Sequence, residues 1–365
     1  MVWVTVFLIS FLIANFLVPN ILLVSLKRRL FDVPNKRSVH SVTSSRLGGV
    51  SFLPSVMVSI CATMAVCRVC GIELSINDPQ QFMVAIGAMM IMYTIGLFDD
   101  VVGLKYRVKF VAQFVASLLI VFSGMWIDNL HGFCGLYSVP AWAGMPFTVL
   151  LIMFVMNAVN LIDGIDGLAS GLSMIALAVY GFMFISLDHM ALSLFAFSML
   201  GCLLAFFRYN VRGFAHKTLK IFMGDTGSLV TGTVLSICAI KLTQCTYGPR
   251  QGELPLLLAY SALIVPCFDV LRVMLSRKRR GKSMFLPDKT HIHHKFLELG
   301  FSARRSMCTI LLISASFTAM NVFMYYVLDW LEAIFIIDVV AFIVMNVFIS
   351  KQVQKLKIEQ VVVRD

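Results

Sequence analysis

Charged residues are scarce in this sequence, and positive charges outnumber negative ones. Asp, Glu, Lys and Arg make up 13% of the 365 residues, with 30 Lys and Arg against 19 Asp and Glu. Hydrophobic residues make up 59%, and the mean hydropathy is +0.89. Globular soluble domains average about 25% charged residues. The shortage of charge therefore excludes an ordinary soluble domain and predicts a polytopic membrane protein.

Signs of a second domain are also absent. The sequence shows no low-complexity tract, no clear internal repeat and no domain boundary. We therefore expect residues 1–365 to form a single transmembrane domain. No small-residue cleavage site follows the first hydrophobic stretch, so we expect that stretch to be retained.

Two isolated polar features lie within or beside the hydrophobic stretches. The nine cysteines lie mostly in such stretches and are expected to pack as small apolar side chains. Cys67 and Cys70 form a CxxC pair, for which a metal or redox site is the alternative. Asp338 lies midway along the last stretch, where we expect a helix contact shielded from lipid, with a proton relay as the alternative.

Long hydrophobic stretches are abundant. A helix of about 20 predominantly apolar residues crosses a bilayer, with a range of roughly 17 to 25. We count eleven such stretches, so the predicted fold class is all-α with about eleven transmembrane helices. Their predicted limits are 2–26, 48–69, 82–98, 110–127, 145–161, 170–187, 190–207, 226–242, 254–273, 306–328 and 333–350.

The basic residues predict how these stretches are oriented. The first stretch is followed directly by Lys27-Arg28-Arg29, which by the positive-inside rule places the N-terminus outside. Threading the stretches from that start puts 27 of the 30 Lys and Arg, and the C-terminus, on the cytoplasmic side. The basic face is expected to meet anionic lipid and an anionic substrate, so the net charge of +11 gives no reason to expect nucleic acid.

Four clusters of ionisable residues interrupt the hydrophobic sequence, each at the end of a stretch. An acid within or beside a bilayer is costly and is a functional hypothesis by default. For a single acid, a solvated helix end is an equal alternative, but the predicted topology places all four clusters on the cytoplasmic side. We therefore expect them to form an active site. The clusters are Phe98 to Asp100, Asn160 to Gly167, Phe222 to Ser228 and Asp288 to His294.

Two of these clusters indicate magnesium and phosphate. Asp225 directly precedes the predicted helix 226–242, so nearby backbone N–H groups are expected to point toward an anion. Mg²⁺ takes one or two protein oxygen ligands together with substrate phosphates, so Asn160 and Asp225 would suffice. Glycines after Asp163 and Asp166 predict a bent backbone that aims these carboxylates inward.

The histidine cluster favours phosphate binding. His291, His293 and His294 are too tightly spaced for an i, i+4 zinc pair on a helix, and no cysteine is near, although zinc is the alternative. Surrounded by lysines, these imidazoles are expected to neutralise a diphosphate.

Taken in order, the polar motifs resemble one family, the polyprenyl-phosphate N-acetylhexosamine-1-phosphate transferases. Within it they are most similar to the bacterial undecaprenyl-phosphate N-acetylglucosamine-1-phosphate transferases of the WecA/TagO type. The likeness spans nearly the whole chain. The motifs are Asp32 to His40, Arg46 to Gly49, Phe98 to Asp100, Asn157 to Leu168, Ile221 to Ser228, Pro266 to Asp269 and Gly281 to His294.

Details of these motifs bear on the donor. The His-Ile-His-His form is similar to the N-acetylglucosamine branch, whereas the peptidoglycan branch usually carries a consecutive histidine run. Ser45 stands where a proline often precedes Arg-Leu-Gly-Gly. The connection from Asn210 to Ile221 is longer than usual, which puts nucleotide and sugar contacts in that loop in question.

The resemblance implies a reaction and a location. UDP-N-acetylglucosamine and undecaprenyl phosphate would give UMP and undecaprenyl-diphospho-N-acetylglucosamine, the first membrane step of a cell-envelope polysaccharide such as lipopolysaccharide or a cell-wall polymer. The cofactor would be Mg²⁺, with Mn²⁺ as an alternative. The enzyme would lie in the bacterial cytoplasmic (inner) membrane with its active site facing the cytoplasm. The family often forms homodimers.

Residue roles follow from the same resemblance. Asp99 and Asp100 would orient the acceptor or take its proton, and Asp163 would organise the network. The base role is expected to be small, because a phosphate monoester with a second pKa near 6 is largely dianionic at neutral pH. Asn160 and Asp225 would hold the metal. The substrate contacts would be Asp166, Asn210 and Phe222 for uridine, the last by stacking, and Arg46, Lys109, His291, His293 and His294 for the diphosphate or acceptor.

Alternatives stay open at this point. The same reaction could use another UDP-N-acetylhexosamine or a phospho-muramoyl-pentapeptide donor, or proceed through a covalent aspartyl intermediate. A secondary transporter would need ionisable groups near the midplane at a repeat interface, whereas these acids lie at one face. A CDP-alcohol phosphotransferase would share the Asp163 to Ala169 pattern but needs an arginine where Ser170 stands.

Overall fold

The computed structural model describes most of the chain. It covers residues 1–28, 30, 44–74, 78–213, 220–247, 250, 252–281, 290–328 and 330–362, the side chains of 360–362 excepted. The predicted motif from Asp32 to His40 lies outside the described residues, and so does the Asp288 part of the histidine motif.

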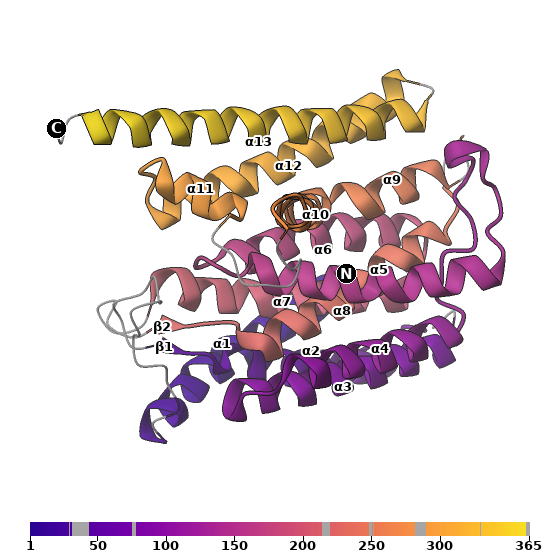
Figure 1. Ribbon diagram of the computed structural model, residues 1–365. Helices are drawn as coiled ribbons and strands as arrows, with labels where there is room; N and C mark the ends of the chain where they lie inside the picture. The colour runs from indigo at the N-terminus through magenta and orange to yellow at the C-terminus, as the bar shows by residue number, and fades with distance from the viewer. Residues whose placement is uncertain are drawn as a thin grey trace.

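The described residues are almost entirely helical, which confirms the predicted all-α class (Figure 1). A single pair of two-residue parallel strands, β1 (Ser44–Ser45) and β2 (Lys220–Ile221), accompanies them. The helices are α1 (Val2–Lys27), η1 (Leu47–Ser51), α2 (Phe52–Val69), α3 (Pro79–Val102), α4 (Tyr106–Phe122), η2 (Phe133–Gly135), α5 (Ala141–Ile162), α6 (Leu168–Ser186), α7 (Met190–Arg212), α8 (Gly224–Thr243), α9 (Glu253–Ser261), α10 (Ile264–Arg279), α11 (Ile292–Glu298), α12 (Ala303–Val327) and α13 (Leu331–Val362).

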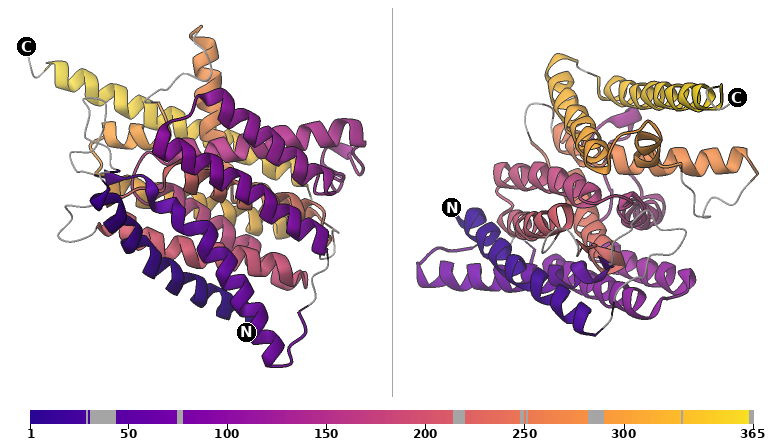
Figure 2. Two further views of the ribbon diagram at one scale, coloured as in Figure 1. Left: turned by 90° about the horizontal axis from the view of Figure 1, so that it is seen from below. Right: turned by 90° about the vertical axis from the view of Figure 1, so that its left-hand side faces the viewer.

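Helix α8 is the centre of the bundle, with α1 to α4 on one side and α10, α12 and α13 on the other (Figures 1 and 2). In its apolar stretch of 18 residues, 89% of the stretch is buried inside the protein. This share is higher than in any other described helix that is long and apolar enough to cross a membrane. Its small residues let neighbouring backbones approach closely. A Cβ added at Gly96 of α3 would collide with the Thr226 backbone, and one at Gly232 would lie 2.7 Å from the Cα of Met156 in α5. These contacts bring the ends of α3 and α5 to the first turn of α8.

Each predicted hydrophobic stretch corresponds to a helix or a helix pair. Among the described residues, nine helices are long and apolar enough to cross a membrane, and the bent pair α9 and α10 would be a tenth. Helix α4 has 17 residues, at the short end of the range for a span. The protein is thus a polytopic helical membrane protein, while the number of crossings and their direction stay predictions.

The continuous helix predicted for 254–273 is wrong. The chain breaks between Ser261 and Ile264, and α9 and α10 meet at 60°. Pro266 explains the break, because a proline ring clashes with the carbonyl four residues earlier, here that of Ala262, and proline has no N–H to donate. Helix α10 consequently turns out of the bundle: it is seen end-on in Figure 1 and projects past its neighbours in Figure 2.

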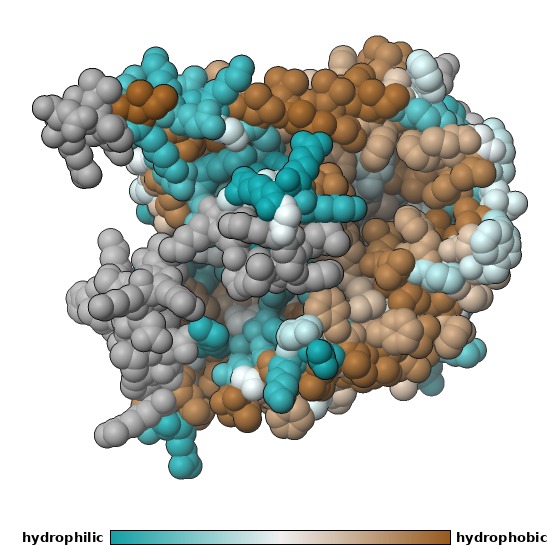
Figure 3. Space-filling view, viewed as in Figure 1, coloured by the Kyte–Doolittle hydropathy of each residue, from teal (hydrophilic) through white to brown (hydrophobic). Residues whose placement is uncertain are grey.

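The surface reflects this arrangement. In Figure 3, apolar residues dominate the face between the two ends of the bundle, and hydrophilic residues gather around α11, the C-terminal part of α13 and the projecting end of α10. Inside, Asp338 of α13 makes the helix contact that its sequence position predicts. Asn321 Nδ2 of α12 donates to Asp338 Oδ2 at 2.8 Å and to Ser261 Oγ of α9 at 2.8 Å.

Candidate active site

Three of the four predicted clusters meet at the first turn of α8. Asp100 lies near the end of α3, Asn160 near the end of α5 and Asp225 at the second residue of α8. Asn160 Nδ2 donates to Asp225 Oδ1, and the Asp225 N–H donates to Asp100 Oδ1 at 2.8 Å. The predicted convergence of these clusters at one end of the bundle is therefore confirmed.

The Arg46-Leu-Gly-Gly motif lies directly against this turn. The N–H groups of Gly48 and Gly49 donate to the carbonyls of Phe222 and Met223 at 3.0 and 2.9 Å. A side chain on either glycine would collide with neighbouring residues, including the Gly227 backbone. The two glycines thus allow the close approach that places exposed Arg46 at the rim of the site.

Lys109 lies between two carboxylates. Its Nζ is 2.9 Å from Asp99 Oδ2 and 3.4 Å from Asp225 Oδ1. The carboxylates of Asp99 and Asp225 are also within hydrogen-bonding reach of each other. The Leu104 N–H donates to the other oxygen of Asp99 at 2.6 Å and fixes its orientation. All three side chains are largely buried, so this is a place where two negative charges require a cation.

Asp99 and Asp100, grouped together by sequence, have different surroundings. Both oxygens of Asp100 accept hydrogen bonds from the start of α8: Oδ1 from the Asp225 N–H, and Oδ2 from the Thr226 N–H at 2.9 Å and Thr226 Oγ1 at 2.6 Å. The first N–H groups of a helix have no partner within it and need such an acceptor. These N–H groups therefore hold the side chain of Asp100, which positions Asp225, whereas the anion that the sequence predicts at this helix end is a substrate phosphate.

The turn between α5 and α6 has the bend that its glycines predict. Helix α5 ends at Ile162, α6 begins at Leu168, and Gly167 between them has φ +80°. Asp163 in this turn has no hydrogen-bond partner among the described residues. Burial, followed by the negative charges of Asp166, Asp225 and Asp100, raises the pKa of Asp163 to about 7. The site thus carries more negative charge than its own lysines balance.

Asn210 and Asp166 connect this turn to β2. Asn210 Oδ1 accepts from the Gly167 N–H at 2.5 Å, and its Nδ2 donates to the Ile221 carbonyl at 2.8 Å. Asp166 Oδ2 forms an ion pair with Lys220. Sequence analysis missed Lys220, although the residue directly precedes the Ile221 to Ser228 motif. Phe222 is half-buried and continues the ladder by donating its N–H to the Ser45 carbonyl at 2.7 Å.

The histidine motif is held by Asp269 of α10, a fully buried residue to which sequence analysis gave no role. Asp269 Oδ2 lies 2.8 Å from His291 Nδ1. Its Oδ1 accepts from Arg272 Nη2 at 2.7 Å and from the Ile292 N–H at 3.1 Å, at the start of α11. Asp269 therefore orients the His291 ring and the first turn of α11 together.

His293 brings the histidine motif onto the acidic turn. The ring lies against Gly164, where an added Cβ would overlap Nε2, and it is stacked on His291 and close to half-buried His294. Its exposure is 1%, and neither ring nitrogen has a hydrogen-bond partner among the described residues. Burial, reinforced by the neighbouring histidines, lowers the pKa of His293 to about 3. The ring is therefore neutral near pH 7, and its contact with a diphosphate stays a prediction.

The described residues contain no three-ligand metal site, but two side chains with oxygen atoms lie together at the acidic centre. No group of three His, Cys, Asp or Glu side chains suited to a metal occurs in that part of the chain, which gives the zinc alternative no support. Asp225 and Asn160, with Asp99 adjacent, present hard oxygen atoms at the place where negative charge is in excess. Such donors are the type that Mg²⁺ prefers.

Comparisons with known proteins agree with this geometry. Residues 82–243, which include Asp99, Asn160 and Asp225, match glycosyl transferase family 4. The chain is 30% identical over 347 residues to the probable undecaprenyl-phosphate N-acetylglucosaminyl 1-phosphate transferase of Bacillus subtilis, covering 93% of this chain and 89% of that protein.

Two further relatives come from other bacteria. The decaprenyl-phosphate N-acetylglucosaminephosphotransferase of Mycobacterium tuberculosis is 32% identical over 298 residues, 76% of this chain and 72% of that protein. The undecaprenyl-phosphate alpha-N-acetylglucosaminyl 1-phosphate transferase of Escherichia coli K12 is 26% identical over 318 residues, 84% of this chain and 80% of that protein. The chain therefore belongs to glycosyl transferase family 4, and it is a glycosyl-1-phosphate transferase.

Proposed function

We propose that the protein transfers N-acetylglucosamine 1-phosphate from UDP-N-acetylglucosamine to undecaprenyl phosphate. The products would be UMP and undecaprenyl-diphospho-N-acetylglucosamine. The observation that carries the proposal is the meeting of Asp99, Asn160 and Asp225, with Lys109 between two of them, at the ends of three helices long and apolar enough to lie in a membrane. A lipid phosphate and a soluble nucleotide sugar can meet only at such a boundary. The names of the B. subtilis and E. coli relatives support the same acceptor and sugar.

In the proposed reaction an oxygen of the lipid phosphate attacks the phosphorus that bears the sugar. The bond from that phosphorus to the UMP oxygen breaks, and UMP leaves. Phosphoryl transfer depends mainly on positioning and on neutralising charge. Lys109 contributes positive charge next to Asp99 and Asp225. Asp99, which Leu104 and Lys109 hold in place, is the carboxylate that orients the acceptor phosphate.

Magnesium fits the acidic part of the site. Asp225 and Asn160 would hold the ion, and the contact between the Asp99 and Asp225 carboxylates and the raised pKa of Asp163 indicate negative charge that a divalent cation would balance. When bound, Mg²⁺ supplies charge neutralisation to the diphosphate and leaving oxygen. Asp100 contributes indirectly, since its hydrogen bonds to the start of α8 fix where Asp225 points.

Donor binding is proposed for the residues around this acidic centre. Phe222 would stack on the uracil base, and Asp166 would contact the edge of that base. Asn210 would hold the backbone segments next to Asp166 and Phe222 in place through its bonds to Gly167 and Ile221. Arg46 at the rim, His291 and half-buried His294 would contact the sugar-diphosphate. We further propose that this end of the bundle faces the cytoplasm of a bacterial inner membrane, since 27 of the 30 Lys and Arg fall on that side of the predicted topology.

The deciding experiment measures UMP release by purified protein given undecaprenyl phosphate and, in turn, UDP-N-acetylglucosamine, other UDP-N-acetylhexosamines and the UDP-linked muramoyl-pentapeptide. We expect UDP-N-acetylglucosamine to give the highest kcat/KM. A higher kcat/KM with another donor would mean that this other UDP-sugar is the donor. The absence of UMP release with every donor would refute the proposed reaction.

A further inference from the structure

Lys220 and Asp166 form an ion pair beside the proposed base site. Lys220 is the first residue of β2, and its side chain is 24% exposed while that of Asp166 is 12% exposed. Two largely buried charges that neutralise each other need good geometry to offset their loss of water. Their position is therefore set by the fold.

Asn210 holds the backbones of the pair in register. Its side chain joins Gly167, the residue after Asp166, to Ile221, the residue after Lys220. Asn210 is itself 3% exposed. The Asn210 side chain thus fixes the distance between the two backbone segments that carry Asp166 and Lys220.

The second oxygen of Asp166 is the unexplained atom here. Lys220 takes Oδ2, whereas Oδ1 is buried and has no hydrogen-bond partner among the described residues. A buried acceptor without a donor is unfavourable, and such exceptions in native structures call for an explanation. An N–H donor from a bound molecule would satisfy this oxygen.

The proposed stacking ring belongs to Phe222, the residue directly after β2. Phe222 follows Lys220 by two residues, and its N–H extends the ladder to Ser45. Side chains two residues apart along a strand lie on one face. A base stacked on Phe222 would therefore meet both the ammonium group of Lys220 and the free oxygen of Asp166.

We propose that Lys220 is a specificity-determining residue that, together with Asp166, recognises the imide edge of uracil. Asp166 Oδ1 accepts the ring N–H, and Lys220 donates to the adjacent carbonyl. Cytosine presents a ring nitrogen acceptor where uracil has this N–H, so it would set two acceptors against each other. The inference rests on the proposed function and names the residue that makes its donor a uridine nucleotide.

Substitution of Lys220 tests this directly. Lys220→Met should raise the KM for the UDP-sugar and the Ki of UMP by about 10- to 100-fold, the range for hydrogen bonds to charged groups. It should change kcat much less and reduce the preference for UMP over CMP. Lys220→Arg should retain most of that preference. Lys105→Met is the matched control, because it removes an exposed lysine from the same end of the bundle.

The outcomes are distinguishable. Unchanged UMP binding and an unchanged preference for UMP over CMP in Lys220→Met would overturn the inference, as would a loss confined to kcat. If the methionine variant does not fold, Lys220→Gln, which removes the charge but keeps a polar side chain, replaces it, and calorimetry of UMP and CMP decides between the same outcomes. A parent enzyme that releases no UMP from any UDP-sugar would instead overturn the proposed function.

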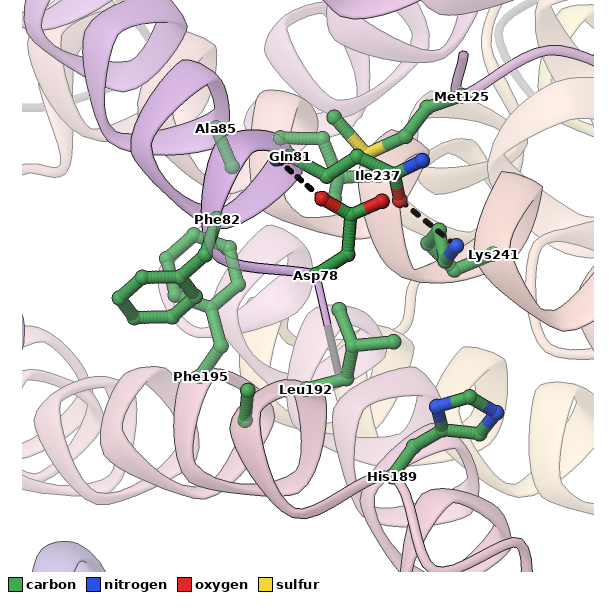
Figure 4. A pocket seen from close by; sticks show the side chains of 11 residues that line it. Asp78, Gln81, Phe82, Ala85, Met125, His189, Leu192, Phe195, Ile237 and Lys241 are labelled. Carbon is green, nitrogen blue, oxygen red and sulfur yellow. Dashed lines mark hydrogen bonds between the residues drawn. The ribbon is translucent and has the colours of Figure 1, made fainter. Parts of the chain in front are cut away.

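A separate recess lies at the opposite ends of α3 and α8 (Figure 4). Helix α3 has 24 residues, so the Asp78 end is about 30 Å from Asp99. The recess encloses about 60 Å³ and is open to the outside. Its walls are mostly apolar, with Phe82 and Phe195 among them.

Two opposite charges flank this recess. Lys241 Nζ donates to Gln81 Oε1 at 2.8 Å, and the Gln81 N–H donates to Asp78 Oδ1 at 3.1 Å. Figure 4 shows Gln81 between the other two side chains. Lys241 is also one of three Lys and Arg that the predicted topology leaves outside, where basic residues are otherwise rare. Membrane topology therefore does not account for Lys241, whereas a binding role would.

We propose that this recess binds a phospholipid whose headgroup carries both a phosphate and an amine. The phosphate would contact Lys241, the ammonium group would contact Asp78, and an acyl chain would lie along Phe82 and Phe195. The charge pair matches a zwitterionic headgroup better than an anionic one. This proposal does not depend on the enzymatic reaction.

Native mass spectrometry of the purified protein with added lipid tests the assignment. Phosphatidylethanolamine should be retained more than phosphatidylglycerol, and Lys241→Met should lower its retention about 10-fold. Asp78→Asn should remove the preference between the two lipids while it still caps α3, because Asn caps as well as Asp. Arg68→Gln, which removes an exposed charge from the same predicted side, should behave as the parent. Equal retention by parent and Lys241→Met, or no preference in the parent, would overturn the proposal.

Discussion

The acidic side of the active site and its histidine side are held in place differently. The acidic side is Asp99, Asn160 and Asp225, on the ends of α3, α5 and α8. Their helices are in direct backbone contact, with Gly96 against Thr226 and Asp100 bonded to the first N–H groups of α8. Metal and phosphate chemistry needs this precision, since small displacements of a charged group reduce catalysis.

The histidine side is His291, His293 and His294, on the seven-residue helix α11. It depends on one buried carboxylate, Asp269, and on the packing of His293 over Gly164. Asp269 itself lies on α10, beyond the bend at Pro266. The proposed chemistry would thus lie in the rigid core of the bundle, and the proposed histidine contacts with the donor would lie on a segment attached at a few points.

Metal removal should have the largest effect, and it should act on the acidic side. We expect EDTA to abolish UMP release by the parent enzyme. Mg²⁺ or Mn²⁺ should restore it, and Ca²⁺ should do worse because it is larger and less demanding of octahedral geometry. Full activity after exhaustive chelation would mean that the reaction needs no metal ion.

Asp225→Asn should come next, with a loss of about 100-fold or more in kcat, comparable to removal of one preorganised electrostatic group. The substitution keeps the side-chain size and leaves the backbone N–H that Asp100 accepts, so folding should be preserved. Turnover is measured alongside thermal unfolding. Asp188→Asn, at an exposed position, is the control. Near-normal turnover of Asp225→Asn would contradict the metal assignment.

Helix contacts behind the acidic side can be tested with two glycines of α3. Gly96→Ala should destabilise the protein by about 1–3 kcal/mol, since the new Cβ collides with the Thr226 backbone. Gly87→Ala in the same helix meets no atom within 4 Å and should be neutral or slightly stabilising. Thermal unfolding of both variants checks this. Equal stability would mean that α3 and α8 tolerate a wider separation than the structure has.

Much of the fold could be predicted from the sequence, because apolar length alone identifies membrane helices. The bend at Pro266 was also readable, since proline disrupts the preceding turn. The different surroundings of Asp99 and Asp100 were not, because they depend on which face of α3 meets α8.

The pairing of Asp166 with Lys220 and the burial of His293 over Gly164 also lay beyond the sequence. Each of these two contacts joins segments far apart in the chain. The order of residue types in the sequence does not show which distant segments come together in the fold. Span orientation, dimer formation and the bound metal stay predictions.

On the histidine side, Asp269→Asn and His291→Ala should each raise the KM for the UDP-sugar about 10-fold, because the carboxylate acts by orienting the ring. The double variant should be no worse than the more severe single one, since both changes remove the same interaction. The KM for undecaprenyl phosphate should change little. Asp338→Asn, a buried acid elsewhere in the bundle, is the control. Additive effects would show that Asp269 acts separately from His291.

The smallest expected effect concerns the pH dependence of His293. An unfolded histidine has a pKa of about 6.5, whereas the pKa of folded His293 is about 3. Between these values the unfolded chain binds a proton that the folded protein does not. The stability contributed is therefore present above pH 6.5 and is lost as the pH falls, by about 1.4 kcal/mol per unit. Thermal unfolding between pH 7 and 5 should fall more steeply for the parent than for His293→Asn. Parallel curves would mean that His293 takes up a proton in the folded state, as a role in neutralising a diphosphate requires.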